Sequence, residues 1–203
     1  MNTKSQRIIG LTGGIATGKT TVSNYINKIY KIPVLDADIY ARKAVLPNSP
    51  ILQEIFIRYG RLVQFPDGQL NRQALGDIIF NDIEEKQWLE SKIHPYVKNK
   101  LEKKISQSKY STIILSIPLL FEARLTNFVT EIWVVYSFRK EQINRLIINN
   151  NMTKKQAEKR ISNQIYVGYK ASLADVVLYN YSTLEVLYRQ VDFYIKNKTF
   201  IHV

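Results

Sequence analysis

Residues 13–20 combine glycines, a lysine and a threonine in a spacing that binds phosphate. Gly13 and Gly18 bracket the segment, and Lys19 and Thr20 follow, as in the pattern G-x-x-x-x-G-K-[ST]. The glycines let the backbone curl so that successive amide hydrogens point at a phosphate. Lys19 can reach the β- and γ-phosphates, while the Thr20 hydroxyl can coordinate Mg²⁺. The candidate nucleotide-binding residues are Gly13, Gly14, Ile15, Ala16, Thr17, Gly18, Lys19, Thr20 and Thr21.

The surroundings of this segment favour nucleotide binding over the alternative, a glycine-rich turn with a solvated lysine. An apolar run at residues 7–12 precedes it and is typical of a buried strand, and helical spacing follows at residues 18–30. A helix that starts near Gly18 adds the positive end of its dipole. The order strand, loop, helix is what the chemistry requires, so we expect ATP or GTP to bind here.

Two aspartates follow the second predicted strand, residues 32–36. Asp36 and Asp38 lie two residues apart, so in an extended chain both would point to one face. Ligands of an open parallel sheet bind beyond the carboxyl ends of its strands, which places both carboxylates near the phosphate loop. One could take the proton of an attacking hydroxyl, and the other could hold Mg²⁺ through water or orient Lys19. The alternative is a helix cap, but the loop upstream favours catalysis for at least one aspartate.

The rest of the chain alternates strands and helices. Further strands are predicted at residues 112–117, 131–136 and 175–179, and helices at 139–149, 153–164 and 182–197. Residues 40–110 are mainly helical, with segments at 51–59, 72–80 and 84–108. We expect the last of these to be broken at His94-Pro95, because proline lacks an amide hydrogen and would start a new helix there or kink one. The pattern predicts an α/β sandwich around a mostly parallel sheet, with a helical block inserted between the second and third strands.

The composition limits the class of protein. The 203 residues include 29 Lys+Arg and 17 Asp+Glu, a formal net charge of +12, which suggests nucleic acid, an anionic membrane or a phosphorylated small molecule as partner. A hydrophobic content of 45% argues against disorder. The absence of cysteine excludes disulfides and a catalytic thiol. No apolar run approaches the roughly 20 residues that span a bilayer, and no signal peptide is visible, so we expect a cytoplasmic protein.

Several segments together resemble the dephospho-CoA kinase family. They are GLTGGIATGKTTV (10–22), VLDADIYARKAV (34–45), LNRQALGDIIF (70–80), WLESKIHPYV (88–97), IPLLFE (117–122), QINRLIINNNMTKKQAEKRISNQ (142–164) and ADVVLYN (174–180). Many NTPases share the phosphate loop, whereas the combination of DAD, His-Pro and PLLFE is much narrower. The resemblance covers about residues 7–180, most of the chain.

The resemblance implies a P-loop kinase that uses ATP to phosphorylate the 3′-hydroxyl of the ribose of dephospho-CoA, the last step of CoA synthesis. Its fold would be a three-layer α/β sandwich with an inserted helical substrate domain and a lid. The nucleotide-binding core would comprise residues 1–41, 112–142 and 171–203, the helical CoA-substrate domain 42–111, and the lid 143–170.

The resemblance also implies roles for single residues. Asp38 would be the general base, Lys19 the charge stabiliser and Arg145 a lid cation. Thr20 would bind Mg²⁺, and Asn180 would contact adenine. The residues on the acceptor side would be Arg42, Arg72 and His94. Packing by His94 and a surface salt bridge by Arg72 stay open as alternatives, as do a substrate contact and a structural hydrogen bond for Glu122 at the end of the PLLFE segment.

Two positions depart from the family pattern. The lid usually has a second arginine four residues after the first, where this chain has Asn149. The cations left to stabilise the transition state are Arg145, Arg160 and Lys170. The strand before Pro118 often carries an aspartate where this chain has Ser116. Asp36 or water would have to compensate in the magnesium site.

Other functions stay open at this point. Another small P-loop kinase, acting on a nucleoside or nucleotide, would share the loop and lid but not the DAD, His-Pro and PLLFE combination. A nucleic-acid-stimulated NTPase would account for the positive charge, and a regulatory switch would bind nucleotide with slow turnover. We expect ATP and dephospho-CoA as partners, no nucleic acid, no membrane, and a monomer.

Overall fold

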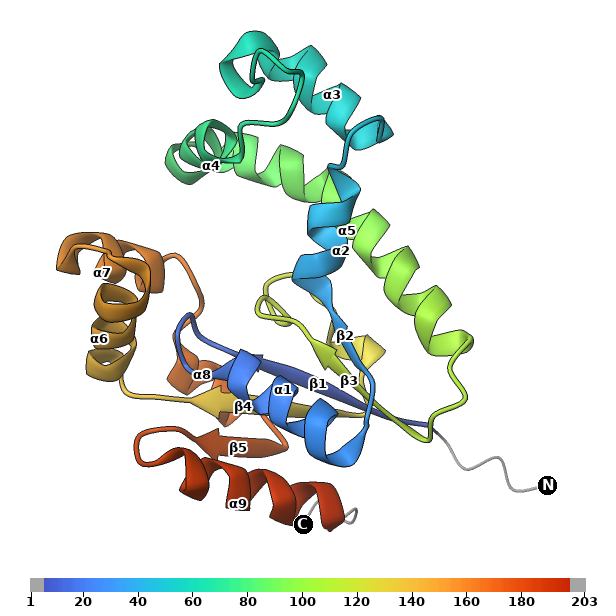
Figure 1. The fold of residues 1–203 in the computed structure, drawn as a ribbon, viewed down its shortest axis with the longest axis vertical. Helices are drawn as coiled ribbons and strands as arrows, with labels where there is room; N and C mark the ends of the chain where they lie inside the picture. Colours follow the sequence, from blue (N-terminus) through green and yellow to red (C-terminus); the bar gives the residue numbers. More distant parts are fainter. Residues whose placement is uncertain (1–5, 198–203) are drawn as a thin grey trace. The chain divides into compact units, whose positions relative to one another are not determined.

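A parallel sheet forms the centre of the first of two compact units. The computed structural model describes residues 6–197, and this unit comprises residues 6–36 and 109–197. Within that range the strands are β1 (Arg7–Gly13), β2 (Val34–Asp36), β3 (Thr112–Ser116), β4 (Glu131–Tyr136) and β5 (Val176–Tyr179), in the order β2-β3-β1-β4-β5 (Figure 1). All four pairings are parallel, and Asp36 lies opposite Ser116. The carboxyl ends of the strands therefore meet at one edge of the sheet.

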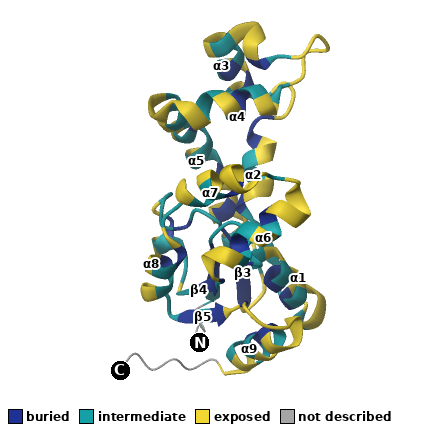
Figure 2. Ribbon diagram, turned by 90° about the vertical axis from the view of Figure 1, so that its left-hand side faces the viewer, coloured by how far each residue is buried: buried dark blue, intermediate teal, exposed yellow. Residues whose placement is uncertain are grey.

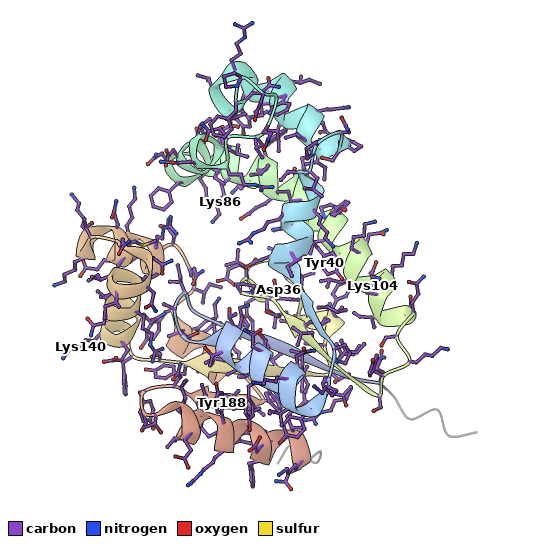
Figure 3. The ribbon with its side chains drawn as sticks, in the orientation of Figure 1. Asp36, Tyr40, Lys86, Lys104, Lys140 and Tyr188 are labelled. Atoms are coloured by element: carbon purple, nitrogen blue, oxygen red, sulfur yellow. The ribbon has the colours of Figure 1, made fainter. Side chains whose placement is uncertain are left out.

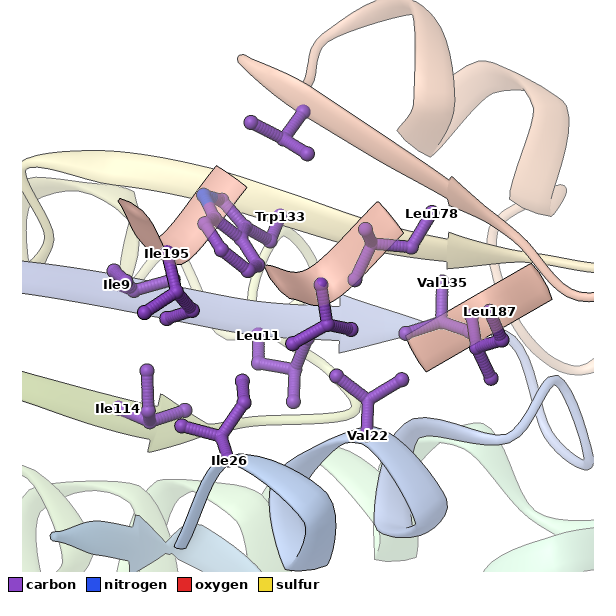
Figure 4. Packing of buried hydrophobic residues seen from close by; sticks show 12 residues of the cluster. Ile9, Leu11, Val22, Ile26, Ile114, Trp133, Val135, Leu178, Leu187 and Ile195 are labelled. Atoms are coloured by element: carbon purple, nitrogen blue, oxygen red, sulfur yellow. The ribbon is translucent and has the colours of Figure 1, made fainter. Parts of the chain in front are cut away.

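Helices cover both faces of the sheet. On one face, α1 (Lys19–Tyr30) and α9 (Leu184–Lys196) contribute Val22, Ile26 and Leu187 to a core with Leu11 and Trp133 of the strands (Figure 4). The other face is covered by α8 (Val167–Ser172), which lies against β1 and β4. Figure 2 shows the buried residues concentrated in the strands. The sheet is thus the middle of three layers, as predicted.

The second compact unit, residues 37–108, is helical. It contains α2 (Ala37–Ala44), α3 (Pro50–Tyr59), the 3-10 helix η1 (Gly60–Val63), α4 (Arg72–Asn81) and α5 (Ile83–Ser106). Its own apolar core is formed by Val45, Ile55, Val63, Leu75 and Leu89. At its surface, Arg58 donates hydrogen bonds of 2.6 and 2.8 Å to Glu85 and lies 4.6 Å from the Trp88 ring centre. These bonds lower the pKa of the Glu85 carboxyl to about 2.

The predicted strands and most of the predicted helices are confirmed, and one prediction about a helix is wrong. Helix α5 runs through Pro95 without a break. Leu89 and Val97, on either side of the proline, are both buried, and this packing keeps the two halves in one helix despite the missing hydrogen bond. Helices α2 and α8 were not anticipated, because they have only eight and six residues, too few for a long apolar period.

The lysine-rich stretch at residues 98–109 exposes its lysine side chains to solvent. Lys100, Lys103 and Lys104 are exposed, and Lys104 projects away from α5 in Figure 3. In the part of the chain that the structure describes, no helix is both long and apolar enough to cross a membrane. The predicted nucleotide-binding core also includes residues 1–5 and 198–203, which lie outside the described residues.

Candidate active site

The phosphate loop connects the carboxyl end of β1 to the first residue of α1. The chain leaves β1 at Gly13, and α1 starts at Lys19. Two residues between them have left-handed backbone angles, Ala16 with φ 59° and Gly18 with φ 103°. The Thr17 amide donates to the Gly14 carbonyl at 3.3 Å, which closes a tight turn. The loop therefore leads into the amino end of α1, where the amides of the first turn and the helix dipole favour an anion.

Side chains from outside hold the loop carbonyls in this conformation. Arg145 of α6 (Arg139–Asn150) donates to the carbonyl oxygens of Ala16 and Thr17 at 3.1 and 3.4 Å. Asn180, which is 6% exposed, donates to the Thr17 oxygen at 2.8 Å and accepts from Arg145 through its own carbonyl at 2.9 Å. In a trans peptide the next N–H points opposite to the carbonyl. Because Thr17 C=O is held outward, the Gly18 N–H is directed into the loop, where a phosphate would bind.

Two glutamines, which sequence reasoning did not identify, bind the peptide groups of Ile15. Gln142 of α6 is 2% exposed and donates to the Ile15 carbonyl at 2.6 Å. Gln164 follows α7 (Lys154–Ser162) and accepts from the Ile15 amide at 2.8 Å. Both line a cavity of about 180 Å³ with Gly14 and Val167. That volume is below the roughly 300 Å³ of small-molecule pockets.

A chain of hydrogen bonds links the loop lysine to the second strand. Lys19 Nζ donates to Ser116 Oγ at 2.6 Å, and Ser116 Oγ donates to Asp36 Oδ2 at 3.2 Å. Thr20 follows on α1 and is exposed. The strand register produces this arrangement, because Asp36 and Ser116 are paired residues at the ends of adjacent parallel strands. Ser116, which departs from the family pattern, thus connects Lys19 to the carboxylate of Asp36 on the neighbouring strand (Asp36 is labelled in Figure 3).

Asp38 does not share an extended segment with Asp36. Strand β2 ends at Asp36 and helix α2 starts at Ala37, so Asp38 lies in the first helical turn. The expectation that both aspartates point to one face through an extended chain is therefore wrong. Ala37, the first residue of α2, is buried.

The residues expected on the acceptor side belong to the helical unit. Arg42 lies in the last turn of α2, and Arg72 starts α4 and donates to the Arg42 carbonyl at 3.3 Å. His94 is half-buried in α5. Within this unit, Arg42 and Arg72 are thus brought together by a hydrogen bond.

The lid cations have different surroundings. Arg160 is exposed on α7. Lys170 is completely buried and pairs with Glu122 at 2.7 Å, which differs from the expectation that it is a lid cation directed at phosphates. Arg145, as shown above, binds loop carbonyls in this structure.

Aromatic rings gather at the ends of β4 and β5, where the Asn180 amide donates to the Tyr136 carbonyl at 2.8 Å. Tyr136 and Tyr179 meet edge-on with ring centres 5.8 Å apart, and Tyr181 lies 5.2 Å from Phe138. Burial raises the pKa of the Tyr136 hydroxyl, and Tyr166 adds to this effect. The phenol is therefore neutral at physiological pH. Phe138, Tyr179 and Tyr181 are partly exposed, and Tyr179 and Tyr181 are the neighbours in sequence of the residue that the resemblance assigns to adenine.

Known proteins with similar sequences point to one family. The family model described as dephospho-CoA kinase matches residues 7–185. A dephospho-CoA kinase of Trichormus variabilis is 54% identical over 188 residues, which cover 93% of this chain and 96% of that protein. A crystal structure from Thermus thermophilus matches with a TM-score of 0.84 at 28% identity, over 97% of this chain and 100% of that chain. A dephospho-CoA kinase structure from Campylobacter jejuni has a TM-score of 0.69 at 23% identity, over 94% and 96% of the two chains, and supports the fold alone.

Proposed function

Because the chain belongs to the dephospho-CoA kinase family, we propose that its phosphate loop delivers the γ-phosphoryl group of ATP to the 3′-hydroxyl of the dephospho-CoA ribose. The activity itself, ATP-dependent phosphorylation of dephospho-CoA, follows from the family. The observation that supports this mechanism is the phosphate loop, whose carbonyls are held outward by Arg145 and Asn180. Phosphoryl transfer needs positioned positive charge and amides more than covalent chemistry, and this loop supplies both.

The proposed step transfers the γ-phosphoryl group from the β-phosphate oxygen of ATP to the acceptor hydroxyl. Asp38 accepts the proton of the acceptor hydroxyl as its oxygen forms a bond to the γ-phosphorus, and the bond to the β-phosphate oxygen breaks to release ADP. Lys19 offsets the negative charge that develops on the transferred group. Arg145 holds the loop and adds a second positive charge beside it. The adenine is proposed to bind at Asn180, next to the aromatic rings.

The residues near Lys19 suit a magnesium ion. Thr20, Ser116 and Asp36 provide oxygen atoms, and Mg²⁺ takes oxygen ligands, commonly one or two carboxylates with phosphates and waters. Within residues 6–197 no cluster of three or more acidic, His or Cys side chains could hold a metal alone. This fits an ion held jointly by nucleotide and protein. When bound, Mg²⁺ neutralises charge on the β- and γ-phosphate oxygens; we propose Thr20 and Asp36 as its residues.

Replacing Asp36 should weaken magnesium use. Asp36→Asn is expected to raise the Mg²⁺ concentration for half-maximal rate about 10–100-fold, the usual effect of losing a group that orients a metal site. The measurement is initial rate against free Mg²⁺ at saturating ATP. Asp77→Asn on α4 removes an exposed carboxylate and should leave the curve unchanged. An unshifted curve for Asp36→Asn would remove this aspartate from the magnesium site.

The wider organisation is part of the same proposal. We propose that residues 42–111 bind the CoA moiety, with Arg42, Arg72 and His94 on the acceptor side, and that residues 143–170 act as a lid that excludes water. We expect the enzyme to act as a cytoplasmic monomer without nucleic acid. The polyanionic substrates give some of the excess positive charge a specific target.

The test of the function is direct. The protein is mixed with Mg-ATP and dephospho-CoA, and the products are separated by chromatography. We expect CoA and ADP. Loss of ATP without CoA, or loss only when DNA or RNA is added, would instead favour another NTPase.

A further inference from the structure

Lys170 is a lysine whose side chain is completely buried. It lies on α8, its exposed fraction is 0%, and its Nζ is 2.7 Å from Glu122 Oε1. The same Nζ donates to the Pro118 carbonyl at 3.0 Å. A lysine charge away from water is costly unless it is paired and hydrogen-bonded. The ammonium group of Lys170 is therefore bound by partners inside the protein and is not exposed to solvent.

Glu122 is turned toward the interior in the same way. Its Oε1 accepts from the Ile165 amide at 3.2 Å in addition to pairing with Lys170. Its Oε2 is buried and has no hydrogen-bond partner within residues 6–197. The Glu122 carboxylate thus binds the Ile165 amide and the Lys170 ammonium group, both in the residues that follow α7. This arrangement does not favour a contact with the acceptor.

The pair reaches the phosphate loop by two short routes. Gln164 precedes Ile165 and accepts from the Ile15 amide at 2.8 Å. The Pro118 carbonyl, which binds Lys170, also accepts from Thr12 Oγ1 at 3.0 Å. Thr12 and Ile15 are the residues on either side of Gly13-Gly14. The ion pair therefore holds both the start of the loop and the segment that binds it.

We propose that Glu122 and Lys170 are a positioning pair, which fixes residues 163–170 against the phosphate loop and so sets its affinity for ATP. This inference rests on the proposed function, because ATP is the ligand whose phosphates the loop takes. The pair acts through Gln164 and Thr12 and does not touch the acceptor. Loss of the pair should weaken ATP binding and leave dephospho-CoA binding intact.

Three variants test the pair: Glu122→Gln, Lys170→Met and the double variant. Removing one partner leaves a buried charge unpaired, whereas removing both avoids that cost, so the double variant guards against failure to fold. For both single variants we expect the KM for ATP and the dissociation constant of Mg-ATP without acceptor to rise about tenfold, a typical size for coupled contacts. The double variant should bind Mg-ATP at least as tightly as the single variant that binds it less tightly. The KM for dephospho-CoA should stay within about twofold.

A matched ion pair separates positioning from stability. Arg7 pairs with Glu131 at the amino end of the sheet, in the same unit and with similarly low exposure. Glu131→Gln should lower the melting temperature without changing either KM. Unchanged ATP binding in all three Glu122 and Lys170 variants would overturn the inference. A rise in the KM for dephospho-CoA in Glu122→Gln alone would also overturn it, and would make Glu122 an acceptor contact.

The same experiment separates this inference from the proposed function. Mg-ATP binding is measured without acceptor, so it reports on the pair even if no CoA forms. A wild-type protein that makes no CoA contradicts the function. A wild-type protein that makes CoA, together with variants that bind ATP normally, contradicts only the pair.

Discussion

Asp38→Asn is expected to lower kcat by at least about 100-fold, the usual share of a general base. Asparagine keeps the size and polarity of the side chain but cannot accept the proton of the acceptor hydroxyl. Asp38 lies in the first turn of α2, and its proposed role is confined to the chemical step. Mg-ATP binding should therefore survive, and the loss should appear in kcat and in kcat/KM for dephospho-CoA.

The control for Asp38→Asn is the measurement of nucleotide binding in the same variant. A Mg-ATP dissociation constant within about twofold of wild type shows that the loop is intact, because losing a group that acts only in the transition state leaves nucleotide binding unchanged. Asp38→Glu retains a carboxylate and should recover part of the rate. A full rate in Asp38→Asn would reject Asp38 as the base and would favour the other role left open for it, a helix cap.

The second large effect is expected from the loop lysine. Lys19→Met should lower kcat about 10²–10³-fold, the usual cost of losing one positioned donor to transition-state charge. Lys19 Nζ is 2.6 Å from Ser116 Oγ, so methionine also interrupts the link to Asp36. The measurement is the single-turnover rate at saturating ATP and dephospho-CoA.

The same helix offers a matched control for Lys19. Lys28 lies in the last turn of α1 and is exposed, so Lys28→Met removes an equal charge far along the helix. Its rate should equal that of wild type. Comparable losses in both variants would mean that the effect is one of overall charge and would contradict the role given to Lys19.

The fold and the family could be predicted from sequence because their signals are local. A short apolar strand, a phosphate loop and an amphipathic helix follow one another within residues 7–30, and each has its own residue pattern. The three-layer sandwich follows from the alternation of strands and helices. The comparisons confirm the family.

The contacts that shape the loop could not be predicted in this way. Gln142 and Gln164 bind the backbone of Ile15, and every residue has such a backbone, so no residue type reveals the partner. Their approach depends on where α6 and α7 pack. The sequence identified Lys170 as a candidate cation for the transition state and did not reveal its burial, since composition does not distinguish a buried lysine from an exposed one.

Ser116 lies between these cases. The sequence identified it as a departure from the family pattern, and the structure places it between Lys19 and Asp36. At Asp38 and Pro95, by contrast, the prediction from the sequence was wrong. In both, the chain is helical where the local pattern predicted otherwise: α2 starts at Ala37, and α5 runs through Pro95.

The most direct test of the account measures product stoichiometry. Purified protein is incubated with Mg-ATP, with and without dephospho-CoA, and CoA and ADP are quantified while ³¹P NMR locates the new phosphate. The account predicts equal amounts of CoA and ADP, a phosphate on the ribose 3′-hydroxyl, and little ADP without acceptor. ADP that forms without CoA, or a phosphate on another hydroxyl, would contradict it.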